Sequence, residues 1–424
     1  MPVFTPELEF SDDYPTIEPS LRLDFANARA LDSRITFTRA STATYVGRDG
    51  LIKTAGVNEP RFDHDPATGE SLGLLIEESR TNLFTYSEAF NTDWDNIRSS
   101  DSGTTATADP EGNTTGAAYK LVANTDNNTH RLDKRNLSMS TSTEYTLSVW
   151  AKAAEYTGVS LTIADSSNLF HGIYFDLSNG TFTNGGNAHS GSMIKYPNGW
   201  YRCIATYTTP ASIGFQQCLI GVLEDGTTKS YAGNNSSGIY IWGAQLEQAP
   251  FPTSYIPTSG STATRAHERA QILGTSLTSF LRQGEGSVIC SGVVNGLTTS
   301  SLYQSWWALD QNNTSNRIWL YARGGANKNQ FIGGAGSTLF AISSSSNTVV
   351  DQKYKLACAY KENDTVFYED GTQVGTDTTV DIPTVTHFGI GSRNDSQLAL
   401  NGTISNLSYY PKRLTNAQLQ TLTQ

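Results

Sequence analysis

The sequence predicts an all-β protein, and three observations support this prediction. Polar and apolar residues alternate in many short segments, which is the pattern of a half-buried strand. These segments are separated by stretches rich in Gly, Asn, Asp and Ser, the residues that favour tight turns. Helical periodicity is scarce, and the 424 residues include only 3 methionines beside many Ser, Thr and Asn, which favours strands over helices.

Charge and composition exclude several classes of protein. Lys and Arg number 29 and Asp and Glu number 40, giving a net charge of −11; this balance argues against a nucleic-acid groove, which needs clustered cations. Charged residues make up 16% of the chain, too few for a coiled coil or a highly charged disordered chain. The sequence has no run of about 18 apolar residues, so membrane insertion is not expected. Met1–Glu7 lacks the basic and apolar stretches of a signal peptide.

The clearest strands lie in the middle and C-terminal parts of the chain. Alternation is clean over Glu144–Trp150, Gly238–Trp242 and Lys353–Tyr360. In the last segment, lysines occupy one face and larger apolar residues the other. The best helix is the C-terminal tail, where Thr415 and Gln418 have the spacing of a capping box.

Changes in composition divide the chain into four parts. One change lies near Asn82–Ser87, and another at Ala249–Gly260, whose three prolines remove backbone donors and indicate a linker. We therefore expect an N-terminal region over residues 1–84, a middle domain over 85–255, a linker over 256–270 and a C-terminal domain over 271–424. The first 20 residues contain four prolines, which is typical of an extended docking arm.

The C-terminal domain resembles the laminin-G or concanavalin-like jelly roll over roughly residues 285–424. The resemblance rests on Thr365–Val374 with its Asp-Gly hairpin turn, on Phe388–Ser392, on Leu400–Tyr410 and on Arg413–Leu419. This order is similar to the closing strands and final short helix of that family. Members of the family bind sugars or proteins, and many hold calcium.

The middle domain resembles a jelly roll of the carbohydrate-binding-module type. Its markers are Asn82–Phe84 with Trp94, then Tyr145–Ala153, Gly199–Arg202 and Ile239–Glu247. Such a resemblance implies a second β-sandwich with a capacity for binding sugars.

The N-terminal region resembles a segment found in bacteriophage tail and head-fibre proteins. The matching stretches are Ile35–Tyr45, Gly50–Ile52, Asn58–Asp63 and Gly73–Leu83. Together, the resemblances imply tandem antiparallel jelly-roll β-sandwiches after an extended N-terminal docking region, with a short C-terminal helix. They also imply a virion appendage, either a tail fibre or a head fibre or spike, made in the host cytoplasm. By the same resemblance, the N-terminal region contacts other virion proteins and the chain forms a homotrimer.

One predicted strand, Arg317–Arg323, provides the main candidate binding surface. Ile318, Leu320 and Ala322 share a face suited to the core. The opposite face carries four candidate glycan-binding or interface residues: Arg317, Trp319, Tyr321 and Arg323. Aromatic and cationic side chains suit stacking on sugars and hydrogen bonding to hydroxyls or carboxylates. They suit a protein interface equally well, or a sandwich in which both faces are buried and the arginines lie at the strand ends.

Tryptophans add one residue to this candidate surface. Trp306 and Trp307 are adjacent, so a regular strand would place them on opposite faces. We expect Trp307 and Leu309 to face inward, and Trp306 and Asp310 to face outward. Four other tryptophans are expected in the core of the middle domain: Trp94, Trp150, Trp200 and Trp242.

No metal or cofactor is predicted from the sequence itself. The aspartates in loops are typical of turns, and none forms an Asp-x-Asp-x-Asp-Gly calcium loop: Asp310, Asp364, Asp370, Asp377 and Asp395. A calcium ion in the C-terminal domain is left open by the resemblance, without named ligands. The related modules often carry an acidic residue where this chain has Gly243, so no calcium ligand is transferred there. The cysteines lack CxxC spacing, which disfavours zinc, and are expected to be buried thiols: Cys203, Cys218, Cys290 and Cys358.

Catalytic patterns are weak, and no catalytic residue is assigned. Gly69–Gly73 matches G-x-S-x-G, but Ser71 precedes a strand and follows a turn, whereas a nucleophile elbow connects a strand to a helix. His64 is expected to be a solvated turn residue. Glu77 and Glu78 are neighbours on opposite faces of a strand, so they cannot form the facing pair of a glycosidase.

These observations favour a non-enzymatic virion protein that binds host cell-surface glycans through its jelly rolls. Two alternatives stay open. One is a purely structural capsid-decoration or adaptor protein. The other is a glycan depolymerase, because carboxylates distant in sequence could meet in space.

Overall fold

A computed structural model describes residues 13–28, 30–116, 118–164, 172–185, 189–212, 214–297, 303–313, 315–336, 340–393 and 398–424. The chain is nearly all β and its sheets are antiparallel, which confirms the predicted fold class. It divides into two compact units. We call the described residues of 1–37, 269–295 and 300–424 the terminal unit, and those of 38–268 and 296–299 the middle unit.

These units divide the chain at other positions than its composition does. The N-terminal segment does not stay apart as an arm throughout, because β1 (Leu21–Asp24) pairs with β33 (Gly402–Tyr410), with Leu21 opposite Tyr409. The stretch expected to be a linker contains β22 (Ala263–Arg265), which pairs with β7 (Arg80–Asn82) in the middle unit. Backbone pairing between distant segments therefore sets the observed boundaries.

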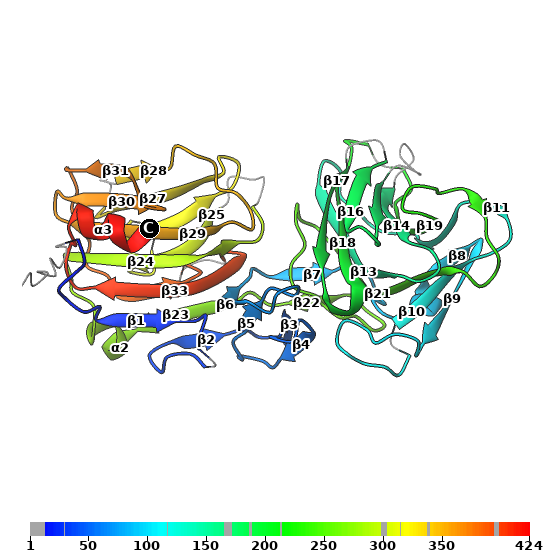
Figure 1. Ribbon diagram of the computed structural model, residues 1–424. Coiled ribbons are helices and arrows are strands. Elements are labelled where there is room, and N and C mark those ends of the chain that lie inside the picture. The colour runs from blue at the N-terminus through cyan, green and yellow to red at the C-terminus, as the bar shows by residue number, and fades with distance from the viewer. Residues whose placement is uncertain are drawn as a thin grey trace, which may run out of the picture. The chain divides into compact units, whose positions relative to one another are not determined.

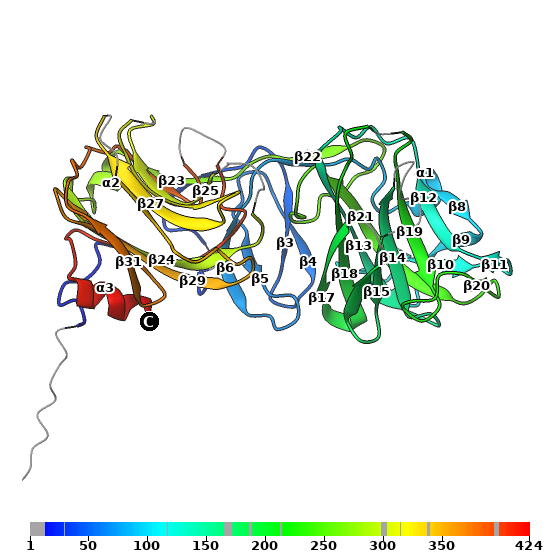
Figure 2. The same cartoon turned by 90° about the horizontal axis from the view of Figure 1, so that it is seen from above.

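The terminal unit is a sandwich of two sheets, seen as two layers in Figure 2. Within this unit, the strands of the first sheet have the order β31 (Thr372–Asp377), β30 (Thr365–Glu369), β29 (Lys353–Lys361), β24 (Glu285–Val294) and β33, and β1 also pairs with β33. The order of the second is β2 (Thr36–Thr38), β23 (Arg269–Leu273), β32 (His387–Ile390), β25 (Tyr303–Asp310), β26 (Arg317–Arg323), β27 (Lys328–Gly334) and β28 (Phe340–Ser343). Phe331 and Phe367 meet between the layers, with ring centroids 6.4 Å apart.

Two local predictions in the terminal unit are confirmed. Asp370 and Gly371 form the turn between β30 and β31 with φ of 47° and 75°, the left-handed pair that a tight hairpin requires. Thr415 caps α3 (Asn416–Thr423), because its side chain accepts from the Gln418 N–H while the Gln418 side chain accepts from the Thr415 N–H. Buried Leu419 packs this short C-terminal helix against the first sheet. A second short helix, α2 (Gly274–Thr278), follows β23.

The middle unit contains two six-stranded sheets (Figure 1). One has the order β17 (His189–Lys195), β18 (Trp200–Thr208), β13 (Glu144–Ala153), β21 (Gly238–Glu247), β10 (Ala118–Ala123) and β9 (Ser99–Thr104). The other has the order β16 (Thr181–Asn184), β15 (Ile173–Asp176), β14 (Gly158–Ala164), β19 (Gln217–Leu223), β12 (His130–Lys134) and β8 (Asp95–Ile97). The remaining elements of this unit are β3 (Ala43–Val46), β4 (Ile52–Ala55), β5 (Phe62–His64), β6 (Ser71–Ile76), β11 (Asn127–Asn128), β20 (Tyr231–Ala232), α1 (Phe90–Asp93) and the 3₁₀ turn Pro197–Gly199.

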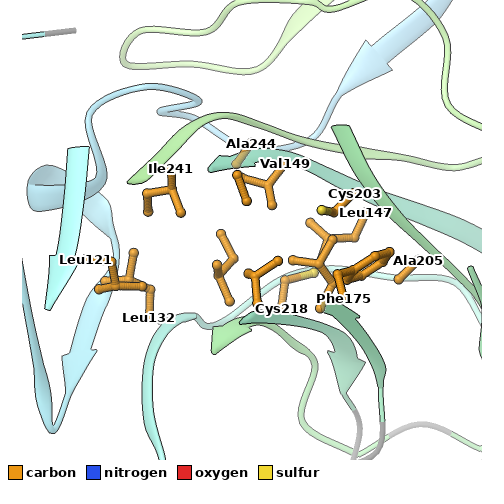
Figure 3. Close-up of a cluster of buried hydrophobic side chains, with 14 of the residues drawn as sticks. Leu121, Leu132, Leu147, Val149, Phe175, Cys203, Ala205, Cys218, Ile241 and Ala244 are labelled. Carbon is orange, nitrogen blue, oxygen red and sulfur yellow. The ribbon is translucent and has the colours of Figure 1, made fainter. Parts of the chain in front are cut away.

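Apolar side chains from both sheets fill the middle unit, as Figure 3 shows. Leu147, Val149 and Ile241 come from one sheet, and Phe175 and Cys218 come from the other. The expectation for the four tryptophans is confirmed, because all of them are buried. Trp94 belongs to this core, and a separate aromatic cluster contains Trp150, Trp200 and Trp242.

A buried network of charges lies in the same unit. The Glu268 carboxylate accepts hydrogen bonds from Arg39 Nη1 at 2.7 Å and from Arg61 Nε at 2.8 Å. The Glu77 carboxylate accepts from Arg61 Nη2 and Arg265 Nη1, each at 2.8 Å. Burial opposes the ionisation of Glu77, but Arg265 and Arg61 outweigh it and lower the pKa of Glu77 to about 2. The network therefore ties residues 39–77 to residues 265–268.

Candidate functional site

The predicted surface on β26 is a packed aromatic cluster. Trp319 and Tyr321 are 1% and 5% exposed, and their ring centroids lie 4.2 Å apart. Tyr303 on β25 contacts both rings, at 5.3 and 4.8 Å. Ala308, Ile332 and Leu398 complete the apolar surroundings. The structure therefore brings Trp319 and Tyr321 together, but both lie beneath neighbouring side chains.

Arginines cover the Trp319 ring. The guanidinium carbons of Arg317 and Arg393 lie 5.3 and 4.6 Å from the ring centroid, within reach of a cation–π interaction. Trp319 Nε1 donates to Ser305 Oγ at 2.9 Å, and Tyr321 Oη donates to Gln330 Oε1 at 2.7 Å. Arg317 and Arg323 are half-buried at opposite ends of the strand. This arrangement matches the packing alternative for the two aromatic residues, with the arginines at the strand ends.

The prediction that Trp306 and Asp310 face outward is wrong. Both residues are fully buried. A bulge shifts the register of β25 between Ser305 and Trp307, and an extra residue in a strand breaks the alternation of faces. Trp306 Nε1 donates to Asn329 Oδ1 at 2.9 Å, and its ring lies 6.4 Å from Tyr354 of the other sheet. Trp307 is also buried, as expected.

The aspartates of the terminal unit serve turns and ion pairs. Asp370 Oδ1 accepts from the Lys355 N–H, Asp377 Oδ1 accepts from the Thr379 N–H, and Asp364 pairs with Arg413. Asp395 lies outside the described residues. Within the described ranges, no group of three or more His, Cys, Asp or Glu could hold a metal ion. All four cysteines are buried and free of disulfides, as expected.

The weak catalytic patterns fall at structural positions. Ser71 is the first residue of β6 and follows a turn, as the sequence indicates. The prediction that His64 is a solvated turn residue is wrong. His64 is the last residue of β5 and is half-buried, and its Nδ1 lies 3.1 Å from the Val46 carbonyl oxygen. Glu77 and Glu78 lie just beyond β6, where Glu77 joins the buried network and Glu78 pairs with Arg80. In the described part of the chain, no helix is long and apolar enough to cross a membrane.

The middle unit has an open groove that the sequence analysis did not identify. Its volume is ≈ 650 Å³. The residues that line it are Arg131, Asp133, Arg135, Asn136, Leu137, Ser138, Gly214, Phe215, Gln216 and Gln217. A smaller hollow adjoins it at Arg131, which lines both, and includes Ser160, Thr162, Tyr174, Gly221 and Lys229. We call the two together the β12–β19 groove.

Strand register sets the floor of the β12–β19 groove. Arg131, Gly221, Ser160 and Tyr174 lie opposite one another in a row across β12, β19, β14 and β15. The lack of a side chain at Gly221 keeps this row open, because a Cβ there would lie 2.3 Å from Ser160 Oγ. The hollow is thus assembled from four strands that are distant in sequence.

Asp133 positions two arginines in the groove. Its Oδ1 accepts from Arg131 Nε at 2.7 Å, and its Oδ2 accepts from Arg135 Nη2 at 2.9 Å. Arg131 Nη1 also donates to Thr129 Oγ1 at 2.9 Å. The hydrogen bond to Asp133 raises the pKa of Arg135. The carboxylate therefore holds both guanidinium groups in place by hydrogen bonds.

Each of the two hollows has an aromatic ring in its lining. The Phe215 side chain is 48% exposed. In the smaller hollow, Lys229 Nζ donates to Tyr174 Oη at 3.3 Å and lies 5.9 Å from the ring centroid. Rings beside guanidinium, hydroxyl and amide groups can stack on and hydrogen-bond a polar ligand that has apolar faces. In the sequence, the Arg-x-Asp-x-Arg alternation over residues 131–135 could have indicated part of this groove. The residues contributed by β14, β15 and β19 have no comparable sequence pattern.

Comparison with known proteins identifies the C-terminal domain. Residues 297–420 match the model of the concanavalin A-like lectin/glucanases superfamily, a laminin-G type. No curated protein matches the chain.

Similar solved structures come from several organisms. A pentraxin from Limulus polyphemus is 16% identical, covering 34% of this chain and 70% of its own, with a TM-score of 0.28. The sialidase module CBM40 of Ruminococcus gnavus, bound to α2,3-sialyllactose, is 14% identical, covering 35% and 88%, with a TM-score of 0.28. Domain 4 of AbnA, an arabinanase from Geobacillus stearothermophilus, is 17% identical, covering 41% and 82%, with a TM-score of 0.32. These scores are too low to carry an argument about function, so identification rests on the family model: the C-terminal part of the chain is a laminin-G/concanavalin-like jelly-roll domain.

Proposed function

We propose that this chain is a non-enzymatic glycan-binding protein and that the β12–β19 groove holds the saccharide. The observation that supports this proposal is the composition of the groove, which combines Tyr174 and Phe215 with hydrogen-bonding side chains along an open hollow. Sugars present apolar C–H faces and many hydroxyl groups, which suit rings and planar polar groups respectively. The lectin-like fold of the C-terminal domain agrees by analogy.

A glycan array with the purified full-length chain tests this proposal. Phe215→Ala is the informative variant, because the exposed ring contributes contact area without belonging to the core. Phe182→Ala is the matched control, since Phe182 is 44% exposed on β16 and does not line the groove. We expect Phe215→Ala to weaken binding about tenfold, equivalent to about 1.4 kcal/mol, and the control to bind unchanged. A folded chain that binds no glycan would favour the purely structural alternative.

The proposal that the chain is not an enzyme has its own test. Among the described residues that line the groove, Asp133 is the one carboxylate, whereas most glycosidases use a pair. We expect no release of reducing ends from any glycan that binds. Release that Asp133→Asn abolishes would instead support the depolymerase alternative.

We further propose that the chain belongs to a bacteriophage virion, as a tail fibre, head fibre or spike. This role is motivated by the resemblance of four stretches within residues 35–83 to a segment of phage fibre proteins, and it includes attachment through the N-terminal region. A homotrimer would link several weak sites and raise their effective concentration at a cell surface. Light scattering should then give about three times 46.0 kDa, and antibodies against the chain should label purified particles in electron micrographs. Unlabelled particles would contradict the virion assignment.

A further inference from the structure

We propose that the β12–β19 groove selects anionic saccharides, that is, sugars that carry an acid group. This inference rests on the proposed glycan-binding function and names the ligand class of the same site. Among the described lining residues, Arg131, Arg135 and Lys229 are cationic and Asp133 is anionic. The groove is thus a cationic surface on a chain whose net charge is −11, and such a patch attracts ligands of opposite charge.

Exposure of the charges strengthens this argument. The Asp133 side chain is 1% exposed, whereas the Arg135 side chain paired with it is 46% exposed. Lys229 is also exposed. Among the lining residues, a ligand therefore meets Arg135 and Lys229, while the Asp133 carboxylate is buried. Asp95, which does not line the groove, also pairs with Arg135 at 3.4 Å.

The pairing of Asp133 with two arginines has a further consequence. A buried carboxylate is stable only when it is well paired, so the Arg131–Asp133–Arg135 arrangement persists without ligand. Asp133 is thus a positioning residue that holds guanidinium groups beside the groove before binding. Guanidinium groups form the strongest hydrogen bonds with carboxylates, phosphates and sulfates, often in bidentate geometry. The preformed pair matches an acid group better than it matches a neutral hydroxyl.

Aromatic rings distinguish a saccharide from a free anion. Phe215 lines the larger hollow together with Arg131 and Arg135, and Tyr174 lies beside Lys229 in the smaller hollow. Each cationic part of the groove therefore has a ring on which a sugar can stack. An inorganic anion would gain nothing from these rings, whereas a charged sugar uses both groups.

The test compares glycans that differ only in their acid group. The panel contains uronic-acid, sialylated, sulfated and phosphorylated oligosaccharides, each beside its neutral parent, and the full-length chain is used at low and high salt. Arg135→Gln and Lys229→Gln are the groove variants, and Lys195→Gln is the control because Lys195 is exposed on β17 outside the groove. We expect each groove variant to weaken binding of acidic glycans five- to tenfold and to reduce its salt dependence, while Lys195→Gln binds as the parent protein does. Unchanged thermal midpoints verify that the variants fold.

Each other outcome has a definite meaning. Neutral parents that bind as tightly as acidic glycans, with binding sensitive to Phe215→Ala, would overturn the anionic selectivity and leave the glycan-binding function standing. Acidic glycans that bind Arg135→Gln and Lys229→Gln as tightly as the parent would overturn this assignment of the groove. Inorganic phosphate that competes at the same concentration as the acidic glycan would overturn the role of the sugar. No binding of any glycan would overturn the proposed function itself.

Discussion

At the scale of single residues, Asp63 is a carboxyl group held where ionisation is disfavoured. Burial raises its pKa to about 7, although the Val46 N–H donates to Asp63 Oδ1 at 2.7 Å and Arg61 lies nearby. The ordinary value for Asp is 3.8. Between these two values the folded chain binds more protons than the unfolded chain, so the stability that Asp63 contributes is lost as the pH rises through 7.

A pH titration of stability tests this assignment. We expect the unfolding free energy of the middle unit to fall between about pH 4 and pH 7, and Asp63→Asn to flatten this decline while keeping an oxygen for the Val46 N–H. Three units of pKa would correspond to roughly 4 kcal/mol, but Asp63 is only half-buried, so about 1–2 kcal/mol is expected. Glu77 acts in the opposite direction, since its pKa of about 2 affects stability only below about pH 4.5. A variant with the same slope as the parent would contradict the assignment.

Trp319 shows why burial has to be known before a binding residue is tested. Its indole is 1% exposed and hydrogen-bonded to Ser305. We therefore expect Trp319→Ala to destabilise the terminal unit by about 3–5 kcal/mol, as measured by urea unfolding. Arg323→Ala, at the half-buried end of β26, should change stability by less than about 1 kcal/mol. A well-folded Trp319→Ala variant that lost glycan binding would return the site to β26.

At the scale of elements, local signals predicted local structure. Alternation located the strands around Tyr145, Ile239 and Leu356, and the Asp370–Gly371 pair fixed a hairpin, because a period of two and a left-handed turn are properties of a few consecutive residues. The burial of Trp306 was not predicted, because the bulge that turns it inward depends on pairing between β25 and its neighbours. The β12–β19 groove was not predicted for the same reason, since its floor is a row of residues across four strands.

The C-terminal helix offers a direct test at this scale. Thr415 satisfies a backbone N–H at the start of α3, and loss of such a cap typically costs about 1 kcal/mol. We expect Thr415→Ala to lower the unfolding free energy of the terminal unit by this amount. Thr415→Ser keeps the hydroxyl group and should restore most of the loss. Equal effects of the two substitutions would show that the methyl group, and not the cap, is responsible.

At the scale of the whole molecule, changes in composition marked Asn82–Ser87 and Ala249–Gly260, but the two compact units divide the chain at other positions. Leu21 pairs with Tyr409, and Glu268 bonds Arg39 and Arg61. Both connections join residues that are more than 200 positions apart, and their register depends on the completed fold. The all-β class could be predicted from the sequence because it is the sum of local strand preferences. The unit boundaries could not, because they depend on long-range contacts.

Two separate cores imply that each unit can open by itself, and the cysteines report this opening. Cys203 and Cys218 are buried in the middle unit, and Cys290 and Cys358 in the terminal unit. Burial raises the pKa of each thiol, so labelling by a thiol reagent requires opening.

Glu268→Gln removes a carboxylate that pairs with Arg39 and Arg61, and breaking a buried pair costs about 3–5 kcal/mol. We expect this variant to accelerate labelling of Cys203 and Cys218, measured by mass spectrometry of peptides, and to leave the rates of Cys290 and Cys358 unchanged. Equal acceleration at all four thiols would mean that the chain opens as one cooperative body.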